Sequence, residues 1–266
     1  MSRCRRAWAA AAALLLAACA SHPAGGPAAA AGDAGYLAAG ARPDGLALVP
    51  PPPAPGSPAA AHDREAMRAA LALQGTPRFA RARHDADLRF PGAAGIFDCA
   101  LGVAVDPDAM PATVRLLRRS LVDAAGATRA AKERYRRPRP FLENGAPTCT
   151  PEEEPALRGS GAYPSGHAAV GWTWALALAS AVPARAEAVL ARGRDYGYSR
   201  QACNVHWHSD VEQGQLLGTA TFVRLLADPA FRADLEAAAA ELDAARAAGA
   251  AAPPGCASGE PAPAAR

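Results

Sequence analysis

The sequence Tyr163-Pro164-Ser165-Gly166-His167 is followed by AAVGWTWALALASAV, residues 168–182, the most apolar window of the chain beyond its N-terminal leader. These fifteen residues carry no charged side chain. They are too few to cross a bilayer, because a membrane-spanning helix needs about 20 apolar residues. We therefore expect a helix buried in the core of a globular domain, with Trp172 and Trp174 among its core residues.

The rest of the chain also shows helical patterns. Alanine is abundant, and no window alternates between apolar and polar residues over the length of a strand. Thr76 precedes Pro77, a pair that is typical of a helix start. The predicted fold class is all-α, a single-domain helical bundle. The expected helices are 63–73, 77–88, 111–135, 168–181, 184–197, 206–226 and 229–247.

The first 18 residues are interpreted as a signal peptide of the lipoprotein type. Three arginines precede a short apolar stretch, and Leu16-Ala17-Ala18-Cys19 resembles a lipoprotein box. Cys19 would then be the lipidated first residue of a periplasmic protein tethered to the outer membrane. The alternative is an ordinary signal peptide with Cys19 incidental, which would give a soluble periplasmic or secreted protein.

Three further segments follow the signal peptide. Residues 19–60 are rich in Ala, Gly and Pro and are interpreted as a spacer, 61–250 as the helical domain and 251–266 as a C-terminal tail. The three leader arginines account for the whole formal charge of +3. Because the mature chain is neutral overall, its charge does not favour nucleic acid as a partner. A membrane is expected only through the lipid anchor.

Four cysteines remain beyond the leader, namely Cys99, Cys149, Cys203 and Cys256. In an oxidising compartment an even number predicts disulfides, and four cysteines allow three pairings. We expect Cys99 to pair with Cys149, and Cys203 with Cys256. A metal site built from these four is a weaker alternative, because no C-x2-C pair is present.

A basic block, K-x6-R-P, begins at Lys132 and ends with Arg139-Pro140. Its simplest interpretation is a solvated basic end of a helix, where cations complement the helix dipole. Pro138 and Pro140 flank Arg139, however, and a residue before proline avoids helical dihedral angles. We therefore expect the helix to end near Arg136 and Arg139 to project from an extended segment. A lysine point charge and a planar guanidinium together suit a phosphate-like anion.

A second block, Pro164-Ser165-Gly166-His167, precedes the apolar helix. Gly166 allows the backbone to approach a ligand, and the first N–H groups of a helix bind anions. His167 would then lie beside the anion, where it can donate or accept a proton. The alternative is a capped helix with an incidental histidine.

A third block contains Ser199-Arg200, His206 and Asp210. Asn204 is a candidate N-cap, and on the helix that follows it His206 and Asp210 would be one turn apart. The carboxylate would accept the Nδ1–H of His206 and leave Nε2 as an oriented nucleophile. His208 would point elsewhere. A metal site of His206, His208 and Asp210 is disfavoured, because an H-x-H pair does not share one face of a helix.

The three blocks, with these spacings and in this order, resemble the bacterial class A non-specific acid phosphatases. This family is part of the superfamily of type-2 phosphatidic acid phosphatases and vanadium haloperoxidases. The resemblance covers roughly residues 45–250, including Ala131-Lys132-Glu133-Arg134-Tyr135 and Gly193-Arg194. One departure is Ala162, where relatives often have serine before Tyr-Pro-Ser-Gly-His.

The resemblance implies a role for each matching residue. His206 would be the nucleophile and form a phosphohistidine, with Asp210 orienting it. His167 would protonate the leaving alkoxide and then activate water. The phosphoryl oxygens would be held by Lys132, Arg139, Ser165, Gly166 and Arg200.

The expected function is that of an exported acid phosphatase that hydrolyses small phosphomonoesters without metal or other cofactor. Vanadate and phosphate should inhibit it, and the resemblance suggests a homodimer. The alternatives are a vanadium haloperoxidase or a lipid-phosphate phosphatase that uses the same site, and a non-catalytic anion-binding lipoprotein. Glu152-Glu153-Glu154 is expected in a loop over the site, either solvated or shaping the substrate pocket.

Overall fold

The computed structural model describes residues 34–253 and residue 256, and all of its regular elements are helices. The α-helices are α1 (Gly45–Leu48), α2 (Pro58–Leu71), α3 (Pro77–His84), α4 (Asp98–Leu101), α5 (Pro111–Ala127), α6 (Arg129–Tyr135), α7 (Pro140–Asn144), α8 (Glu154–Arg158), α9 (Gly166–Ala181), α10 (Ala186–Ala202), α11 (His208–Leu225) and α12 (Pro229–Ala247). Short 3-10 helices cover Ala39–Ala41, Gly92–Phe97, Pro151–Glu153 and Pro183–Arg185. The predicted all-α class is confirmed, and no helix in the described part of the chain is long and apolar enough to cross a membrane.

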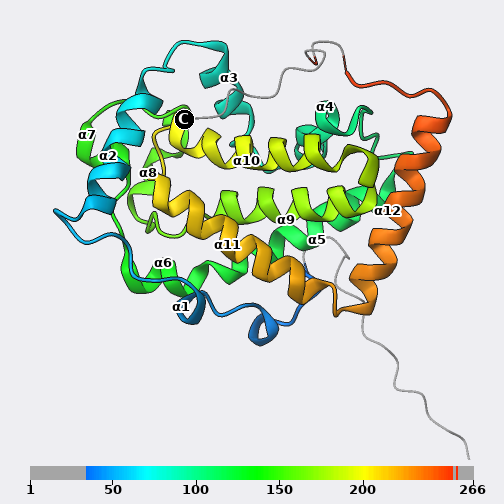
Figure 1. Cartoon of the computed structure of the whole chain (residues 1–266), viewed down its shortest axis with the longest axis horizontal. Coiled ribbons are helices and arrows are strands. Elements are labelled where there is room, and N and C mark those ends of the chain that lie inside the picture. Colours follow the sequence, from blue (N-terminus) through cyan, green and yellow to red (C-terminus); the bar gives the residue numbers. More distant parts are fainter. Residues whose placement is uncertain (1–33, 254–255, 257–266) are drawn as a thin grey trace, which may run out of the picture. The chain divides into compact units, whose positions relative to one another are not determined.

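The apolar helix α9 forms the centre of the domain and packs against α5, α10 and α11 (Figure 1). Trp174 is fully buried, as predicted, and donates its indole N–H to the carbonyl of Leu117 at 2.9 Å. Trp172 is only partly buried and bonds the hydroxyl of Thr219 instead. The largest core cluster gathers side chains from α5, α9, α10 and α12 and from the segment before α5.

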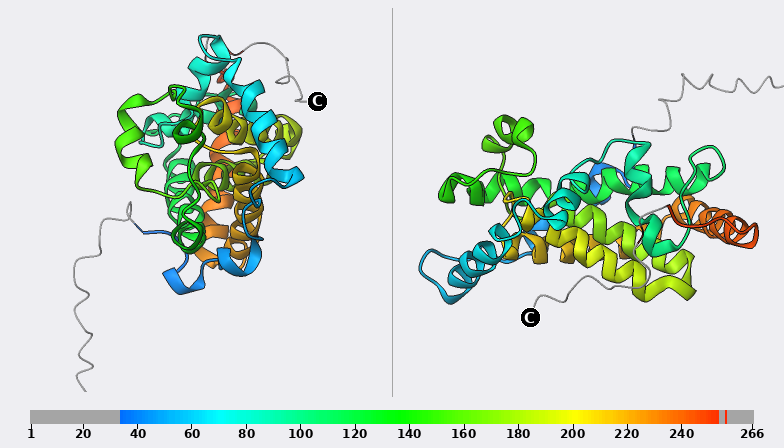
Figure 2. Two further views of the ribbon diagram at one scale, coloured as in Figure 1. Left: turned by 90° about the vertical axis from the view of Figure 1, so that its left-hand side faces the viewer. Right: turned by 90° about the horizontal axis from the view of Figure 1, so that it is seen from above.

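Glycines on α11 allow close contact with α9. A Cβ at Gly218 would lie 2.6 Å from the carbonyl oxygen of Ala169, and one at Gly214 would collide with the carbonyl oxygen of Ser165. Because the two helices are so close, the first turns of α9 and α11 lie side by side. Figures 1 and 2 show that α10 ends at this same end of the bundle, where α6, α7 and α8 also lie.

Four predicted helices differ from the structure by four residues or more, and one of them, predicted over 184–197, continues to Ala202 as α10. The stretch 111–135 forms two helices, α5 and α6, which are separated at Thr128, where the hydroxyl donates to the carbonyl of Ala125 at 2.8 Å. Helix α2 begins at Pro58, not at residue 63, since Ser57 caps it. Helix α3 ends at His84, four residues earlier than expected, although Thr76 does cap it.

The segment 34–57, which the sequence assigns to the spacer, is part of the packed domain. Tyr36 is buried, donates its hydroxyl to Asp234 at 2.7 Å and its backbone N–H to Asp123 at 2.7 Å. The predicted spacer therefore extends at most to residue 33. The predicted signal peptide and Cys19 lie outside the described residues.

The disulfide pairing predicted from the sequence is wrong in both bonds. Cys149 is bonded to Cys203 and Cys99 to Cys256, with Cα–Cα distances of 4.6 and 5.3 Å. The loop before α8 lies against the end of α10, where the N–H of Cys149 donates to the carbonyl of Cys203 at 3.2 Å. The tail returns to α4, because the N–H of Ala104 binds the carbonyl of Ala251. Disulfides join residues that the tertiary fold brings together, which spacing in the sequence does not reveal.

Candidate active site

The three sequence blocks meet at the end of the bundle where α9 and α11 begin. The backbone N–H of Ser165 donates to the carbonyl of Asp210 at 2.8 Å, which joins the second block to the third. The Lys132 ammonium donates to the carbonyl of Gly161 at 2.9 Å, which joins the first block to the second. The predicted proximity of the three blocks is thus present in the structure.

Arg139 projects from an extended segment, as its flanking prolines predict. Helix α6 ends at Tyr135, and Arg139 has φ −81° and ψ 153° immediately before α7. Its guanidinium is buried and donates to the carbonyls of Leu157 at 3.1 Å and Val205 at 3.0 Å, and to the hydroxyl of Ser160 at 2.9 Å. Fixed in this way, the guanidinium is a preorganised cation.

The same guanidinium determines the tautomer of His206. Nη1 of Arg139 lies 3.2 Å from Nε2 of His206. A guanidinium only donates hydrogen bonds, so Nε2 must be the unprotonated acceptor and Nδ1 carries the hydrogen. Nδ1 lies 3.4 Å from Oδ2 of Asp210, an ion-pair distance without a well-aligned hydrogen bond. The lone pair of Nε2 therefore faces the cations, which is the orientation that a nucleophile requires.

The pairing of His206 with Asp210 arises from a different local structure than predicted. Asn204 is not the N-cap of α11. It has φ +60° after the end of α10, and its side chain bonds Asn144 and the carbonyl of Ala146. Helix α11 starts at His208, so His206 lies in the loop before it, where its N–H donates to the carbonyl of Arg200.

Arg200 is the third cation, and it is 1% exposed. Its Nε and Nη1 atoms are buried without a hydrogen-bond partner in the protein. Unpaired buried donors are costly, and guanidinium donors match the oxygens of a phosphate. The residue therefore indicates an anion site between Arg139, Arg200 and His206.

His167, at the start of α9, is partly exposed. Its Nε2 lies 3.0 Å from the carbonyl oxygen of Ala86, which can only accept a hydrogen bond. Nε2 therefore carries a hydrogen, and Nδ1 is the nitrogen that is available to a ligand. The carbonyl of Ala86 is a site group that the sequence did not reveal.

Ser165 and Gly166 form the cap and the first residue of α9. The Ser165 Oγ accepts the N–H of Ala168 at 3.2 Å, so its hydroxyl proton remains available for donation. A Cβ at Gly166 would lie 3.8 Å from Cε of Lys132, an ordinary contact. The protein alone does not require glycine here, and a side chain would extend toward the cations. Both observations agree with an anion bound at this helix start.

The electrostatics of the site reflect concentrated positive charge. Burial, and then the charge of Arg139, lowers the pKa of Lys132 to about 7. Burial and Arg200 lower the pKa of Arg139 to about 10. Burial, with the nearby cations, also holds the pKa values of His167 and His206 well below the usual 6.5. A bound dianion would offset each of these shifts.

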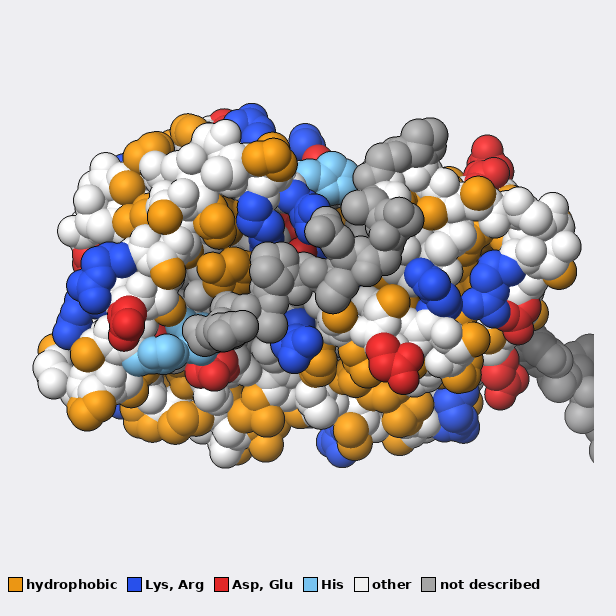
Figure 3. All heavy atoms as spheres, turned by 45° about the horizontal axis from the view of Figure 1, so that its top comes forward, with side chains coloured by type: hydrophobic (Ala, Val, Ile, Leu, Met, Phe, Trp, Pro, Cys, Tyr) orange, Lys and Arg blue, Asp and Glu red, His pale blue; other side chains and the backbone are white. Residues whose placement is uncertain are grey.

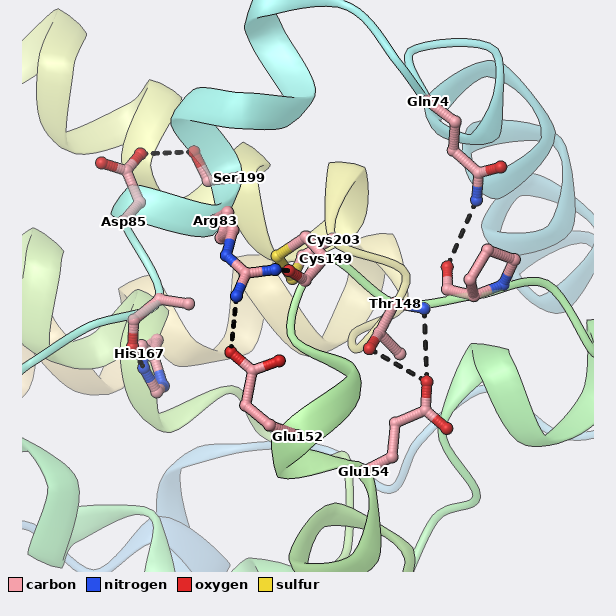
Figure 4. The surroundings of a disulfide bond; sticks show 12 residues. Gln74, Arg83, Asp85, Thr148, Cys149, Glu152, Glu154, His167, Ser199 and Cys203 are labelled. Atoms are coloured by element: carbon pink, nitrogen blue, oxygen red, sulfur yellow. Dashed lines mark hydrogen bonds and ion pairs between the residues drawn. A yellow bond between two sulfur atoms is a disulfide. The ribbon is translucent and has the colours of Figure 1, made fainter.

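A cleft of about 390 Å³ begins at Ala86, beside His167. Arg83 lines this cleft and donates hydrogen bonds to Glu152 at 2.9 Å and to the carbonyl of Cys149 at 3.2 Å (Figure 4). Glu152 and Glu153 line the cleft, whereas Glu154 bonds Thr148 away from it. Two of the three acidic residues of the loop thus border this cleft. The lining residues are Ala80, Arg83, His84, Ala86, Asp87, Arg89, Gly92, Thr150, Glu152 and Glu153.

His208 lies away from these groups, as predicted. It is near Glu212 at 3.3 Å and Gln201 at 3.2 Å, and its ring contacts His62 edge-on. This placement excludes the alternative metal site of His206, His208 and Asp210. Over residues 34–253 and 256, no group of three His, Cys, Asp or Glu side chains is arranged to hold a metal ion.

The basic residues of the site are internal, not part of a charged outer face. On the face shown in Figure 3, Lys and Arg side chains are interspersed with acidic and hydrophobic ones.

Arg137 and Asp63 are site residues that the three sequence blocks do not include. Arg137 donates to Asp210 at 2.6 Å and to Asp63 at 2.6 Å, behind the His206 imidazole. Arg137 belongs to the same proline-rich segment as Arg139, and no local pattern distinguishes an arginine that binds substrate from one that binds a carboxylate.

Comparison with known proteins agrees with this geometry. Residues 116–233 match the family model described as PAP2 superfamily. The chain is 41% identical over 197 residues to the non-specific acid phosphatase of Salmonella typhimurium, covering 73% of this chain and 78% of that one. It is 37% identical over 203 residues to an acid phosphatase of Zymomonas mobilis, covering 76% and 77%. It is 37% identical over 207 residues to the non-specific acid phosphatase of Providencia stuartii, covering 77% and 84%.

Proposed function

The chain belongs to the PAP2 superfamily, as a phosphoric monoester hydrolase of the acid phosphatase type, and on this premise we propose that it hydrolyses phosphomonoesters through a phosphohistidine on Nε2 of His206, without a metal. The observation that carries the proposal is the Nε2 atom, held unprotonated 3.2 Å from Arg139. The unpartnered Nε and Nη1 atoms of Arg200 support it.

In the first step, Nε2 of His206 attacks phosphorus. A P–N bond forms, and the bond from phosphorus to the leaving oxygen breaks. The imidazole becomes positively charged, and Asp210 stabilises this charge from the Nδ1 side. Lys132, Arg139 and Arg200 neutralise the phosphoryl oxygens, which is the main requirement of phosphoryl transfer.

His167 serves the leaving group. Its Nε2–H is held by Ala86, so a protonated Nδ1 donates to the leaving oxygen. In the second step the neutral Nδ1 takes a proton from water, the water oxygen bonds to phosphorus, and the P–N bond breaks. Inorganic phosphate and free His206 result. Since burial and the cations lower the pKa of His167 in the protein alone, the substrate dianion raises it and makes His167 an acid. This coupling favours catalysis on the acid side of neutrality.

The test compares His206→Ala with the matched control His208→Ala, two residues away but outside the site. Both variants are assayed with p-nitrophenyl phosphate in EDTA, and acid-quenched samples are analysed for phosphohistidine. We expect His206→Ala to lose activity by about 10³-fold or more and to form no phosphoenzyme. His208→Ala should retain both. Equal losses in the two variants, or activity that EDTA abolishes and Mg²⁺ or Zn²⁺ restores, would contradict the proposal.

Vanadate distinguishes the haloperoxidase alternative. As a phosphate mimic, vanadate should inhibit hydrolysis by occupying the cradle around Arg200. Peroxide-dependent bromide oxidation by the vanadate-loaded protein would favour the alternative instead.

We further propose export, with Cys19 as a lipid anchor in the periplasm. Two disulfides support an oxidising compartment. The predicted signal peptide indicates export, and the predicted lipoprotein box indicates lipidation at Cys19. Labelled palmitate that enters the wild-type protein but not Cys19→Ser would support the anchor, and no labelling of the wild type would overturn it.

A further inference from the structure

Arg137 bridges two buried carboxylates from different helices. Its Nη2 donates to Asp63 of α2 at 2.6 Å, and its Nη1 donates to Asp210 of α11 at 2.6 Å and to the hydroxyl of Ser209 at 2.8 Å. The Asp63 and Asp210 side chains are 2% and 0% exposed. These are charge-assisted hydrogen bonds with little water around them, so the arrangement is well defined.

The two carboxylate oxygens of Asp210 have different partners. Oδ1 accepts from Arg137. Oδ2 accepts the N–H of Trp207 at 2.8 Å and is the oxygen near Nδ1 of His206. Arg137 therefore fixes the plane of the carboxylate so that Oδ2 faces the imidazole.

Asp63 fixes Arg137 in turn. Its Oδ1 accepts the N–H of Ser209 at 2.8 Å, and its Oδ2 accepts the Ser209 hydroxyl at 2.7 Å. The indole of Trp207 lies beside the guanidinium, 5.4 Å from its carbon to the ring centroid, and donates to the carbonyl of Pro138 at 2.9 Å. Helix α2 is thus hydrogen-bonded to the first turn of α11, the turn that contains Asp210.

The positive charge of Arg137 also favours the ionised form of Asp210. Burial raises the pKa of Asp210 to about 6, and Arg137 is the strongest influence in the opposite direction. Asp63 balances Arg137, so the three groups together carry one negative charge, which can be shared with a positively charged His206. The ionisable groups that affect Asp210, or that Asp210 affects, are Arg137, Lys132, Arg139, His206 and Tyr163.

We propose that Arg137, held by Asp63, is a positioning residue for the reaction: it keeps Asp210 ionised and aimed at Nδ1 of His206. The inference rests on the proposed phosphohistidine function. Arg137 binds the carboxylate oxygen that faces away from the imidazole, so it acts through Asp210 and not on the phosphate. This separates it from the three substrate cations.

The test compares Arg137→Gln with Arg134→Gln, a matched loss of charge at an exposed position of α6. For Arg137→Gln we expect kcat about 10- to 100-fold lower, a size typical of residues that orient catalytic groups, with KM changed less than about threefold. Without the arginine the pKa of Asp210 rises further, so the acidic limb of the pH–kcat profile should move to higher pH. Arg134→Gln should match the wild type in all three measurements.

Arg137→Lys and Asp63→Asn keep the proposal testable if the glutamine variant does not fold. Lysine retains the charge but cannot bridge two carboxylates as a planar fork does. It should therefore restore the acidic limb while leaving kcat reduced. Asp63→Asn should lower kcat in the same direction and by less than Arg137→Gln.

An Arg137→Gln or Arg137→Lys protein with lower thermal stability but unchanged kcat and pH profile would overturn the inference, because Arg137 would then be only a structural tie. Failure of the proposed function looks different. In that case the wild-type enzyme itself would form no phosphohistidine, whatever residue occupies position 137.

Discussion

Binding of inorganic phosphate at alkaline pH should draw about one proton from solution into Lys132. The Lys132 pKa is lowered to about 7 by burial and by the neighbouring Arg139. At about pH 8.5 such an amine is only about 3% protonated. A phosphate dianion in contact with it would move the pKa back toward the ordinary value of 10.5, so that the amine becomes almost fully charged in the complex.

Isothermal titration calorimetry measures this uptake directly. Phosphate is titrated at about pH 8.5 in two buffers of different ionisation enthalpy, and the difference in heat gives the number of protons bound. Linkage also requires that the Kd for phosphate rise by nearly tenfold per pH unit in this range. Lys132→Arg is the control, because arginine is charged both before and after binding. Its uptake should be smaller than that of the wild type by about one proton.

Two results would refute this reasoning. One is an uptake below about 0.3 proton in the wild type, which would mean that Lys132 is already charged in the free protein. The other is equal uptake in the wild type and in Lys132→Arg, which would assign the proton to another group, such as one of the histidines. Either result would contradict the inference that Lys132 is mostly neutral in the free protein and becomes charged when phosphate binds.

Two other predictions follow from the structure. The folded protein holds the pKa values of His167 and His206 below 6.5, so the unfolded chain binds more protons on these two side chains as the pH falls. Each histidine should therefore lower the free energy of unfolding by up to about 1.4 kcal/mol for each unit by which the pH decreases below 6.5. Guanidinium denaturation of the wild type and of His206→Asn at pH 6.5 and 5.5 isolates the histidine contribution, because Asp210 and Asp98, whose pKa values burial raises to about 6, act in the opposite direction. An unchanged pH dependence in His206→Asn would contradict it. Loss of the disulfide between Cys149 and Cys203, which closes a loop over a sequence separation of 54, should cost about 4 kcal/mol by chain entropy. Denaturation of the double serine variant measures this cost, and a non-reducing peptide map that links Cys149 to Cys99 would contradict the pairing.

Much of the site could be predicted from local rules. Proline on both sides of Arg139 restricts the backbone before any tertiary contact forms, and the extended conformation appears as expected. The apolar window 168–182 could only be a core helix, and Trp174 is fully buried within it. The sequence also predicts that His206 and Asp210 lie together, but it places both on one helix. In the structure α11 begins at His208, so His206 lies in the loop before the helix.

Predictions failed where distant segments decide the outcome. The predicted disulfides, Cys99 with Cys149 and Cys203 with Cys256, are wrong, because Cys149 and Cys203 meet only when the loop before α8 folds onto the end of α10. The break at Thr128 was missed as well, although it is local: α5 ends at Ala127 and α6 begins at Arg129 within a pattern that is helical throughout. Asn204 resembles an N-cap in sequence and instead adopts a left-handed conformation that binds Asn144.

The sequence by itself therefore determined the all-α class and the inventory of the site: three cations, two histidines, one carboxylate and a glycine at a helix start. These features depend on helix periodicity, proline geometry and side-chain chemistry, which act over a few residues. Only the tertiary structure decided which nitrogen of each histidine is free and which arginine serves Asp210. Those properties come from Arg139, from the Ala86 carbonyl and from Asp63, groups that lie 67, 81 and 74 positions away from the residues they bind. Contacts over such separations form through packing, and no local pattern encodes them.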